Sequence, residues 1–321
     1  MSAAICLLAY SFAVAALGPP LLTRWTHAGV APRFGVAAWL AAIGSVLAAW
    51  TLAAAFLVGE LVRDWHQPGQ AVLSACVAVL REGVLGRHGG LVQIGLFILA
   101  ACAVTAGAVL AGRLGRSLLR ARASTRQHAW AARLIGQRLA EGEAVVLDAP
   151  ERVAYCVPGR PNTIVVTSAA IDALTQRHLD AVLCHERAHL TGHHHLILAL
   201  TRGLATILPR FQLFTSGAAE IARLLEMCAD DTAARTHGPA TVLGALLALS
   251  NTAGPIPSGA LGATSVGVLA RATRLASPPR PGQRIRAQLV LALLSALLAV
   301  GPLLTALLTA TGTALCNPMI S

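Results

Sequence analysis

The chain has 321 residues, of which 55% are hydrophobic and 12% are charged, and its mean hydropathy is +0.66. Soluble domains carry about 25% charged residues, so this composition excludes an ordinary soluble enzyme and favours a membrane protein. The formal net charge of +11 rests on arginine, because the sequence contains no lysine, and these arginines gather at the ends of apolar segments, which argues against direct binding of nucleic acid.

Four apolar stretches are long enough to cross the hydrocarbon core of a bilayer, which is about 30 Å thick. The first lacks a basic segment at its start, so we expect a retained helix and not a cleaved signal peptide. The last contains Gly301-Pro302 and is longer than a span requires, so we expect it to be tilted or kinked. Residues 1–112 are predicted to be a three-helix transmembrane region with an external loop at 63–90, and residues 286–321 a fourth helix with a short external tail. The predicted spans cover residues 3–22, 36–62, 91–112 and 287–315.

The distribution of arginine predicts how these spans are oriented. Five arginines follow the third span between residues 113 and 126, and five precede the fourth span between residues 271 and 286. Positively charged residues near span ends favour the cytoplasmic side. We therefore expect a cytoplasmic domain at residues 113–285, in a multi-pass protein of a bacterial inner or plasma membrane whose first partner is the lipid bilayer.

The segment between the third and fourth spans has the pattern of a mixed domain. Residues 152–157 and 163–167 flank a Pro158-Gly159 turn and predict two strands. The whole chain is thus expected to be a mainly α membrane protein, with four transmembrane helices and a cytoplasmic α+β domain between spans three and four. Apolar periodicity predicts the helices of this domain at residues 113–139, 168–174, 177–195, 218–236 and 239–251.

Residues 185–189 carry the most informative motif of the chain, His-Glu-Arg-Ala-His. On a helix, positions i and i+4 share one face, so His185 and His189 can bind one Zn²⁺. Glu186 lies beside them and can act as the base that activates water. The seven cysteines show no CxxC spacing, so neither a disulfide framework nor a cysteine-bound zinc is suggested. The motif predicts metal-assisted hydrolysis of a peptide bond.

A catalytic zinc needs a third protein ligand, and the sequence offers two candidates. Glu226 and Asp230 share a helix face, so Glu226 could bind the metal while Asp230 accepts the outer N–H of a ligand histidine. Alternatively, residues 185–195 fit the pattern HExxHxxGxxH of the metzincins, in which His195 would be the third ligand. That pattern also requires a methionine turn, and the only interior methionine, Met227, falls in a predicted helix. We therefore favour Glu226.

Three segments near the motif receive predictions of their own. The strand Ile164–Ser168 could pair with an extended substrate backbone, as edge strands do, but packing in the core of the domain is the favoured interpretation. The apolar residues 195–209 are expected to lie against the bilayer. Residues 276–285 are rich in proline, glycine and arginine, and we expect them to be a linker into the last span.

Further motifs surround the His-Glu-Arg-Ala-His core. They are Ala-Tyr-Cys-Val-Pro-Gly at residues 154–159, the strand at 164–168, Leu-Asp-Ala-Val-Leu-Cys at 179–184, Leu208-Pro209, and Glu226–Asp230 followed by Asp231. Together with the four-span layout, they resemble the BlaR/MecR family of integral-membrane zinc metallopeptidases over residues 1–315.

The resemblance implies a gluzincin-type site with His185, His189 and Glu226 as zinc ligands and Glu186 as base. It also implies signal transduction by cleavage of a cytoplasmic winged-helix repressor of the BlaI/MecI type, and we count a second copy of the chain, in a homodimer, among the candidate partners. Antibiotic-sensing members carry a penicillin-binding domain with a Ser-x-x-Lys motif, which a chain without lysine cannot contain. We therefore expect any signal to enter through loop 63–90, the membrane or a partner.

Two other functions stay open at this point. A quality-control or processing peptidase of the HtpX or CAAX prenyl protease type shares the HExxH and ExxxD motifs but cuts membrane proteins or prenylated tails. A non-catalytic membrane transducer with a structural zinc is the third candidate. Glu186 argues against the transducer, because a purely structural zinc site does not need that base.

Overall fold

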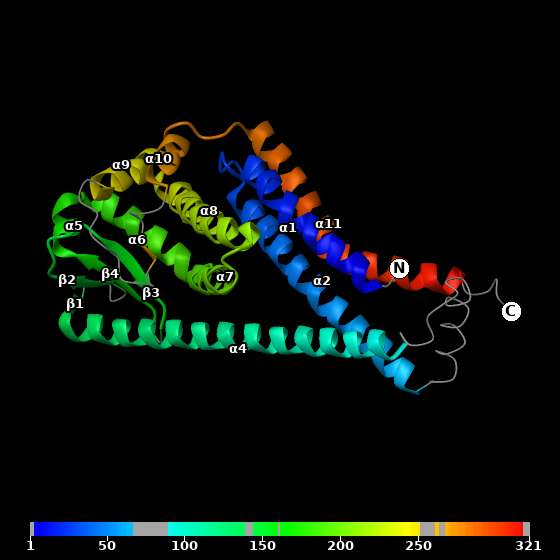
Figure 1. Cartoon of the computed structure of the whole chain (residues 1–321). Coiled ribbons are helices and arrows are strands. Elements are labelled where there is room, and N and C mark those ends of the chain that lie inside the picture. The colour runs from blue at the N-terminus through cyan, green and yellow to red at the C-terminus, as the bar shows by residue number, and fades with distance from the viewer. Residues whose placement is uncertain are drawn as a thin grey trace. The chain divides into compact units, whose positions relative to one another are not determined.

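The computed structural model describes residues 3–66, 89–138, 144–159, 161–250, 261–262 and 267–316. The chain divides into two compact units. The first combines residues 1–17, 41–113 and 296–321, and the second combines residues 18–40 and 114–295. The first unit consists of long helices, whereas the second also contains a small sheet (Figure 1).

Four helices in the described part of the chain are long and apolar enough to cross a membrane. This confirms the predicted mainly α membrane protein with four spans and a small mixed sheet. Of the predicted loop 63–90, residues 67–88 lie outside the described residues. The four helices are α1 (Ala3–Thr26), α2 (Pro32–His66), α4 (Gly89–Ile135) and α11 (Pro281–Cys316).

The third span and the predicted helix 113–139 are one continuous helix, α4, of 47 residues. Alanine, leucine and arginine dominate its arginine-rich part, and these residues have high helix propensity. The helix ends at Ile135, just before Gly136, a residue type that commonly follows a helix C-terminus. Near that end, Arg133 donates a hydrogen bond of 2.7 Å to the Thr163 hydroxyl, which ties α4 to the sheet.

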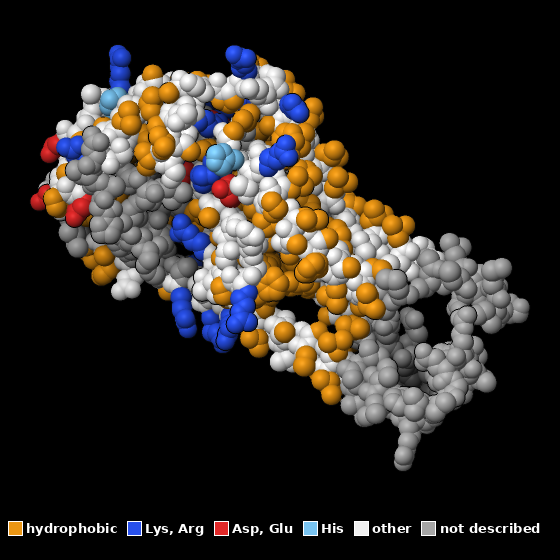
Figure 2. Space-filling view, turned by 45° about the horizontal axis from the view of Figure 1, so that its top comes forward, with side chains coloured by type: hydrophobic (Ala, Val, Ile, Leu, Met, Phe, Trp, Pro, Cys, Tyr) orange, Lys and Arg blue, Asp and Glu red, His pale blue; other side chains and the backbone are white. Residues whose placement is uncertain are grey.

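The first unit is held together by small residues and a few large ones. Ala4, Leu7, Ala49 and Ala53 form a buried cluster between α1 and α2. Close packing through small residues is the usual way in which membrane helices associate, because lipid tails are as apolar as leucine. Figure 2 shows hydrophobic side chains covering the exposed surface of the span helices. This surface matches the environment that a bilayer core provides.

The sheet of the second unit has five strands in the order β1-β2-β4-β3-β5. The predicted hairpin is confirmed, because β3 pairs antiparallel with β4. β2 pairs with β4 in parallel, so β4 is an inner strand. The favoured interpretation of Ile164–Ser168 as a core strand is therefore confirmed, and the alternative of a free edge for substrate pairing is wrong: all residues of β4 are buried, and both of its edges are already paired. The strands are β1 (Gln137–Arg138), β2 (Ala144–Leu147), β3 (Ala154–Val157), β4 (Thr163–Thr167) and β5 (Leu261–Gly262).

Six helices accompany the sheet in the described part of this unit. Thr167 and Thr175 cap the first two of them, each accepting a hydrogen bond from a backbone N–H of the first turn. α6 contacts β3 and β4 of the sheet as well as α7, α8 and α9, so it is the central helix of the unit. The helices are α5 (Ser168–Ala173), α6 (Gln176–Thr191), α7 (His194–Ile207), α8 (Gln212–His237), α9 (Pro239–Ser250) and α10 (Val268–Ala276).

The predicted single helix 177–195 is wrong at its end. α6 stops at Thr191, and α7 begins at His194 in a new direction. His193 adopts a left-handed conformation with φ 52°, which interrupts the helical hydrogen-bonding pattern. The predicted linker 276–285 is shorter than expected, because α11 already begins at Pro281, a residue that suits the first position of a helix.

α7 buries one face and exposes the other. Leu198 and Leu204 are almost completely buried, whereas Leu196 and Leu200 are 40% and 38% exposed. The helix packs on α8, so part of the apolar character of residues 195–209 serves the core of the unit. Contact of its exposed face with the bilayer stays a prediction.

The loop between α1 and α2 docks on α8 and α10. Arg223 on α8 donates hydrogen bonds to the carbonyl oxygens of Thr26 and His27, at 2.8 and 3.0 Å. Arg274 on α10 donates to the carbonyl oxygen of Gly29 at 2.7 Å. Gly29 has φ +60°, and a Cβ there would lie 2.2 Å from the Met227 sulfur, so both its conformation and its contact require glycine.

Candidate active site

The two motif histidines and the intervening glutamate lie on the buried face of α6. His185, Glu186 and His189 are 3%, 0% and 0% exposed. The helical spacing brings the Nε2 atoms of His185 and His189 to 3.1 Å from each other. Two imidazole nitrogens therefore converge on one point in the interior.

α8 adds a carboxylate to this point. Glu226 Oε1 lies 3.4 Å from His189 Nε2, and Glu226 Oε2 lies 3.4 Å from His185 Nε2. Ligand atoms bound tetrahedrally to zinc at about 2.0–2.1 Å are separated by about 3.3 Å, so these spacings suit one zinc ion. The three side chains form the group of metal-binding residue types that the described residues bring together, with one atom of each within 4.8 Å of the others.

Asp230 and Arg271 form hydrogen bonds and ion pairs with members of this group. Asp230 Oδ1 lies 3.1 Å from Nδ1 of His185, the contact expected from the ExxxD spacing. Arg271 on α10 donates to both oxygens of Asp230 at 2.7 Å, and to Glu226 Oε2 at 3.0 Å. Both residues are only 1% exposed. One buried guanidinium thus links the two carboxylates and, through Asp230, His185.

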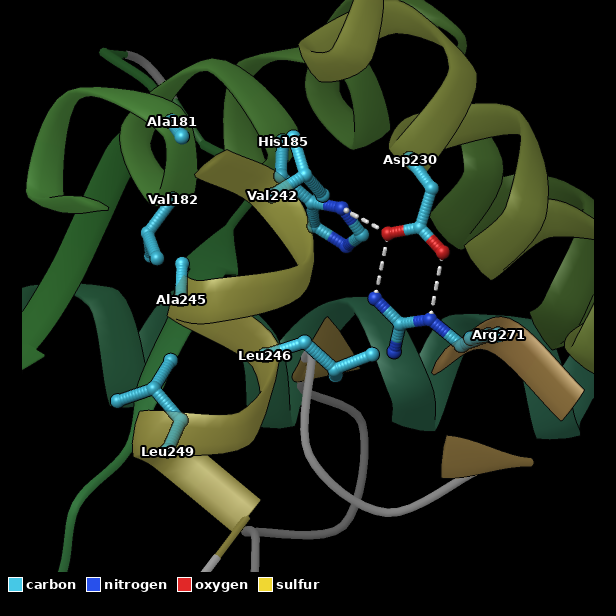
Figure 3. A pocket seen from close by; sticks show the side chains of 9 residues that line it. All are labelled: Ala181, Val182, His185, Asp230, Val242, Ala245, Leu246, Leu249 and Arg271. Atoms are coloured by element: carbon cyan, nitrogen blue, oxygen red, sulfur yellow. Dashed lines mark hydrogen bonds and ion pairs between the residues drawn. The ribbon is translucent and has the colours of Figure 1, made fainter. Parts of the chain in front are cut away.

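A small pocket reaches this network, as Figure 3 shows. Its polar end consists of His185, Asp230 and Arg271, joined by the dashed contacts. The rest of its lining is aliphatic and comes from α6 and α9, at Ala181, Val182, Val242, Ala245, Leu246 and Leu249. The network therefore faces an apolar environment, which strengthens its charge interactions.

The second histidine has a partner that the sequence did not suggest. His189 Nδ1 lies 2.8 Å from Nδ1 of His194, the first residue of α7. His194 is 7% exposed. Of the three consecutive histidines at residues 193–195, His194 is thus the one that contacts the site.

His195 lies elsewhere. It belongs to none of the metal-binding groups among the described residues, and its ring centroid is 6.1 Å from that of His193. Successive helix residues point about 100° apart, so the bend that directs His194 toward His189 turns His195 away. The geometry favours Glu226 over His195 as the third ligand.

The charges of the site follow from burial and from these contacts. Burial lowers the pKa of His185, but the hydrogen bonds with Asp230 and Glu226 outweigh it and raise the pKa to about 9. Burial lowers the pKa of His189 to about 3. Burial would raise the pKa of Glu226, yet its interactions with His189 and with the positively charged Arg271 bring it to about 2. The Glu226 carboxylate is therefore ionised, the form in which a carboxylate can bind a metal.

Glu186 differs from the other buried carboxylates. Burial raises its pKa to about 8, against a smaller opposing contribution from the Cys156 thiol, and neither of its oxygens has a nitrogen or oxygen hydrogen-bond partner among the described residues. The neighbouring Cys156 of β3 is 1% exposed, and burial followed by the negative charge of Glu186 raises the pKa of its thiol. A buried carboxylate without a partner is costly by about 1–3 kcal/mol or more, and it is expected where a reacting group needs a free oxygen.

The residue types present fit a bound zinc ion. Two imidazoles and one carboxylate are borderline-soft and hard ligands of the kind that catalytic zinc uses, and three protein ligands leave a fourth position open. The orphaned oxygens of Glu186 lie beside these ligands, where water would need a base. This fit rests on the donor set and on the unpaired carboxylate together.

Sequence reasoning missed Arg271 and His194 as members of the site. Arg271 was counted, with Arg274, among the arginines that mark the membrane edge, yet both are buried against carboxylates. Arg271 follows Glu226 by 45 residues, and no periodicity links the two. Two arginines three residues apart on a short amphipathic helix were the only signal.

Comparison with known proteins gives one result. Residues 119–276 match the sequence model of Peptidase family M48. No curated protein and no solved structure matches the chain. The matched segment contains the two histidines of α6, Glu226 and Arg271. Residues 119–276 are therefore similar to Peptidase family M48, a membrane-associated family of zinc metallopeptidases.

Proposed function

We propose that this chain is a membrane-anchored zinc metalloendopeptidase in which His185, His189 and Glu226 bind zinc and Glu186 is the catalytic base. The observation that carries the proposal is the buried convergence of two imidazoles and one carboxylate at 3.1–3.4 Å within an M48 peptidase domain. Asp230 and Arg271 hold this arrangement in place.

In the proposed mechanism, the bound metal and Glu186 have separate roles in hydrolysis. Bound zinc supplies a Lewis acid that acidifies water and polarises the scissile carbonyl. Glu186 accepts the proton of the attacking water and delivers it to the leaving amine. Burial alone raises its pKa to about 8, and a bound cation beside it would lower that pKa, so that the carboxylate is ionised and able to accept a proton near neutral pH. Burial around it excludes bulk water, so protons pass through this one carboxylate.

The substrate is proposed to be a cytoplasmic protein. The arginine-rich ends of α4 and α11 support a cytoplasmic M48 domain. The resemblance of residues 179–190 and 226–231 to the BlaR/MecR family favours a winged-helix repressor of the BlaI type and a role in signal transduction. The M48 match is equally compatible with a membrane quality-control or processing peptidase of the HtpX type.

The experiment uses the full chain purified in detergent and reconstituted in nanodiscs. Zinc content and cleavage are measured for the wild type, Glu186→Gln, Glu226→Ala and His195→Ala, with purified BlaI-type repressor and unfolded β-casein as separate substrates. We expect about one zinc per chain in the wild type, Glu186→Gln and His195→Ala, loss of zinc in Glu226→Ala, and cleavage losses of about 10²–10⁴-fold in Glu186→Gln.

The two substrates separate the candidate roles. Cleavage of the repressor at one site supports signalling, whereas cleavage of casein alone supports quality control. Loss of zinc from His195→Ala but not from Glu226→Ala would overturn the ligand assignment. Unchanged cleavage by Glu186→Gln would overturn the role of Glu186 as the base. A zinc-loaded wild type that cleaves neither substrate would overturn the peptidase proposal and leave a transducer.

A further inference from the structure

The bend between α6 and α7 has an unusual construction. His193 is the one residue other than glycine with a positive φ among the described residues. Before it, Gly192 leaves no Cβ in the space that the next ring needs: a Cβ there would lie 2.4 Å from Nε2 of His194. The backbone N–H of Gly192 still donates to Ala188, so the chain leaves the helix only at the following residue. The bend folds His194 back over the last turn of α6.

The folded-back ring meets the one side of His189 that the site leaves open. Nε2 of His189 faces His185 and Glu226, at 3.1 and 3.4 Å. Nδ1 faces His194 Nδ1 at 2.8 Å, and the two rings stand nearly perpendicular, at 83°. Two imidazole nitrogens at this distance share one proton, since one must donate and the other must accept.

Only one arrangement of that proton leaves the site able to bind a metal. A metal-binding Nε2 needs a free lone pair, so His189 must carry its proton on Nδ1. His189 then donates to Nδ1 of His194, whose own proton lies on Nε2. The reverse arrangement would place a proton on His189 Nε2, between His185 and Glu226, where it would block the metal.

We propose that His194 is a positioning residue that fixes His189 in its metal-binding tautomer, and that the bend at Gly192 and His193 exists to hold it there. The proposal rests on the zinc site proposed above. Partners of this kind on ligand histidines raise metal affinity by about 10–100-fold. On the other proposed ligand, Nδ1 of His185 donates to Asp230. The acceptor is thus a carboxylate for His185 and an imidazole for His189.

The histidine run supplies its own controls. His195 is adjacent in sequence and shares α7, but its ring lies near His193 and outside the metal-binding group. His194→Leu removes the acceptor and keeps a similar volume. His194→Asn restores an acceptor, because the amide oxygen of asparagine can take the place of Nδ1. His195→Leu is the matched control for a histidine lost from the same helix.

The zinc dissociation constant of the full chain is measured by competition with a chromophoric chelator. We expect His194→Leu to weaken zinc binding by about tenfold or more, His194→Asn to recover most of it, and His195→Leu to match the wild type. Circular dichroism and the unfolding temperature of the metal-free variants check that each one folds.

A second pair of variants tests the bend. In Gly192→Ala the new methyl group displaces the His194 ring, so zinc binding should weaken as in His194→Leu, and the double variant should be no weaker than either single one. Equal zinc affinity in the wild type and His194→Leu, or full additivity in the double variant, would overturn the positioning role while the zinc site stands. A wild type without zinc would overturn both this inference and the proposed function.

Discussion

At the scale of single residues, the site depends on one guanidinium. Arg271 is the counter-charge of two buried carboxylates, Glu226 and Asp230. Removing one partner of such a buried group leaves the rest uncompensated, which costs about 3–5 kcal/mol. The proposed zinc site therefore needs this residue even though Arg271 is not one of the proposed ligands.

We predict that Arg271→Gln lowers both the stability and the zinc affinity of the protein. The unfolding temperature should fall in the metal-free state and recover in part with zinc, because the ion supplies positive charge to Glu226. Differential scanning fluorimetry with and without zinc measures this. Arg284→Gln is the control, since Arg284 is half-exposed and its contact with Asp231 contributes about 0–1 kcal/mol. Equal shifts in the two variants would contradict the prediction.

The His185 charge predicts how zinc binding depends on pH. In the metal-free site its pKa is raised to about 9, so it is protonated at pH 7 and must lose that proton before Nε2 can bind zinc. Zinc affinity should therefore rise with pH, by up to about tenfold per unit between pH 7 and 9, and level off above. Calorimetry in two buffers of different ionisation enthalpy should find about one proton released per zinc at pH 7. Release of no proton would show that His185 is already neutral.

At the scale of elements, α8 and α10 each serve two neighbours. α8 carries Glu226 and Asp230 for the site and Met227 against Gly29 of the first loop. α10 carries Arg271 for the site and, one turn later, Arg274 for that loop. The loop between α1 and α2 is therefore packed on the same helices that present the proposed ligand and its supporting charge.

We predict that Arg274→Gln loosens this loop. The variant loses the hydrogen bonds to Gly29 and Asp231, which should lower the free energy of unfolding by about 1–3 kcal/mol. Hydrogen exchange of residues 26–31 should also speed up. Arg280→Gln, a change at an exposed position of the same arginine-rich stretch, should leave both unchanged. Unaltered exchange in Arg274→Gln would contradict the docking.

At the scale of the whole molecule, all three proposed ligands belong to one compact unit. His185, His189 and Glu226 lie within residues 114–295, whereas the first unit contributes none of them. Metal removal should then destabilise the peptidase unit without unfolding the helices of the first.

We predict that chelation lowers the unfolding temperature of the unit that contains residues 114–295. A ligand present at a thousand times its dissociation constant stabilises the folded state by about 4 kcal/mol, and that contribution disappears with the metal. Limited proteolysis after chelation should cut between residues 114 and 295 while the span helices stay intact in detergent. Cleavage that begins in the span helices would contradict this.

The sequence by itself determined the spans, the motif helix and the carboxylate helix. Each is a local pattern: long apolar runs, an i, i+4 pair at His185 and His189, and another at Glu226 and Asp230. Helical periodicity translates such spacings directly into a shared face. The contact between Asp230 and His185 followed from the same reasoning.

The tertiary structure alone decided which other residues complete the site. Arg271 reaches Glu226 from 45 residues away, and that closure depends on how α10 packs, which no local pattern encodes. His194, and not His195, contacts His189 because of one left-handed residue, His193. Its conformation ends the α6 helix and sets the direction in which the side chains at the start of α7 point. The inner position of β4 likewise depends on long-range strand pairing. The spacing of residues along the chain determined which side chains of the motif share a helix face. The packing of the helices determined that Arg271 and His194 lie next to them.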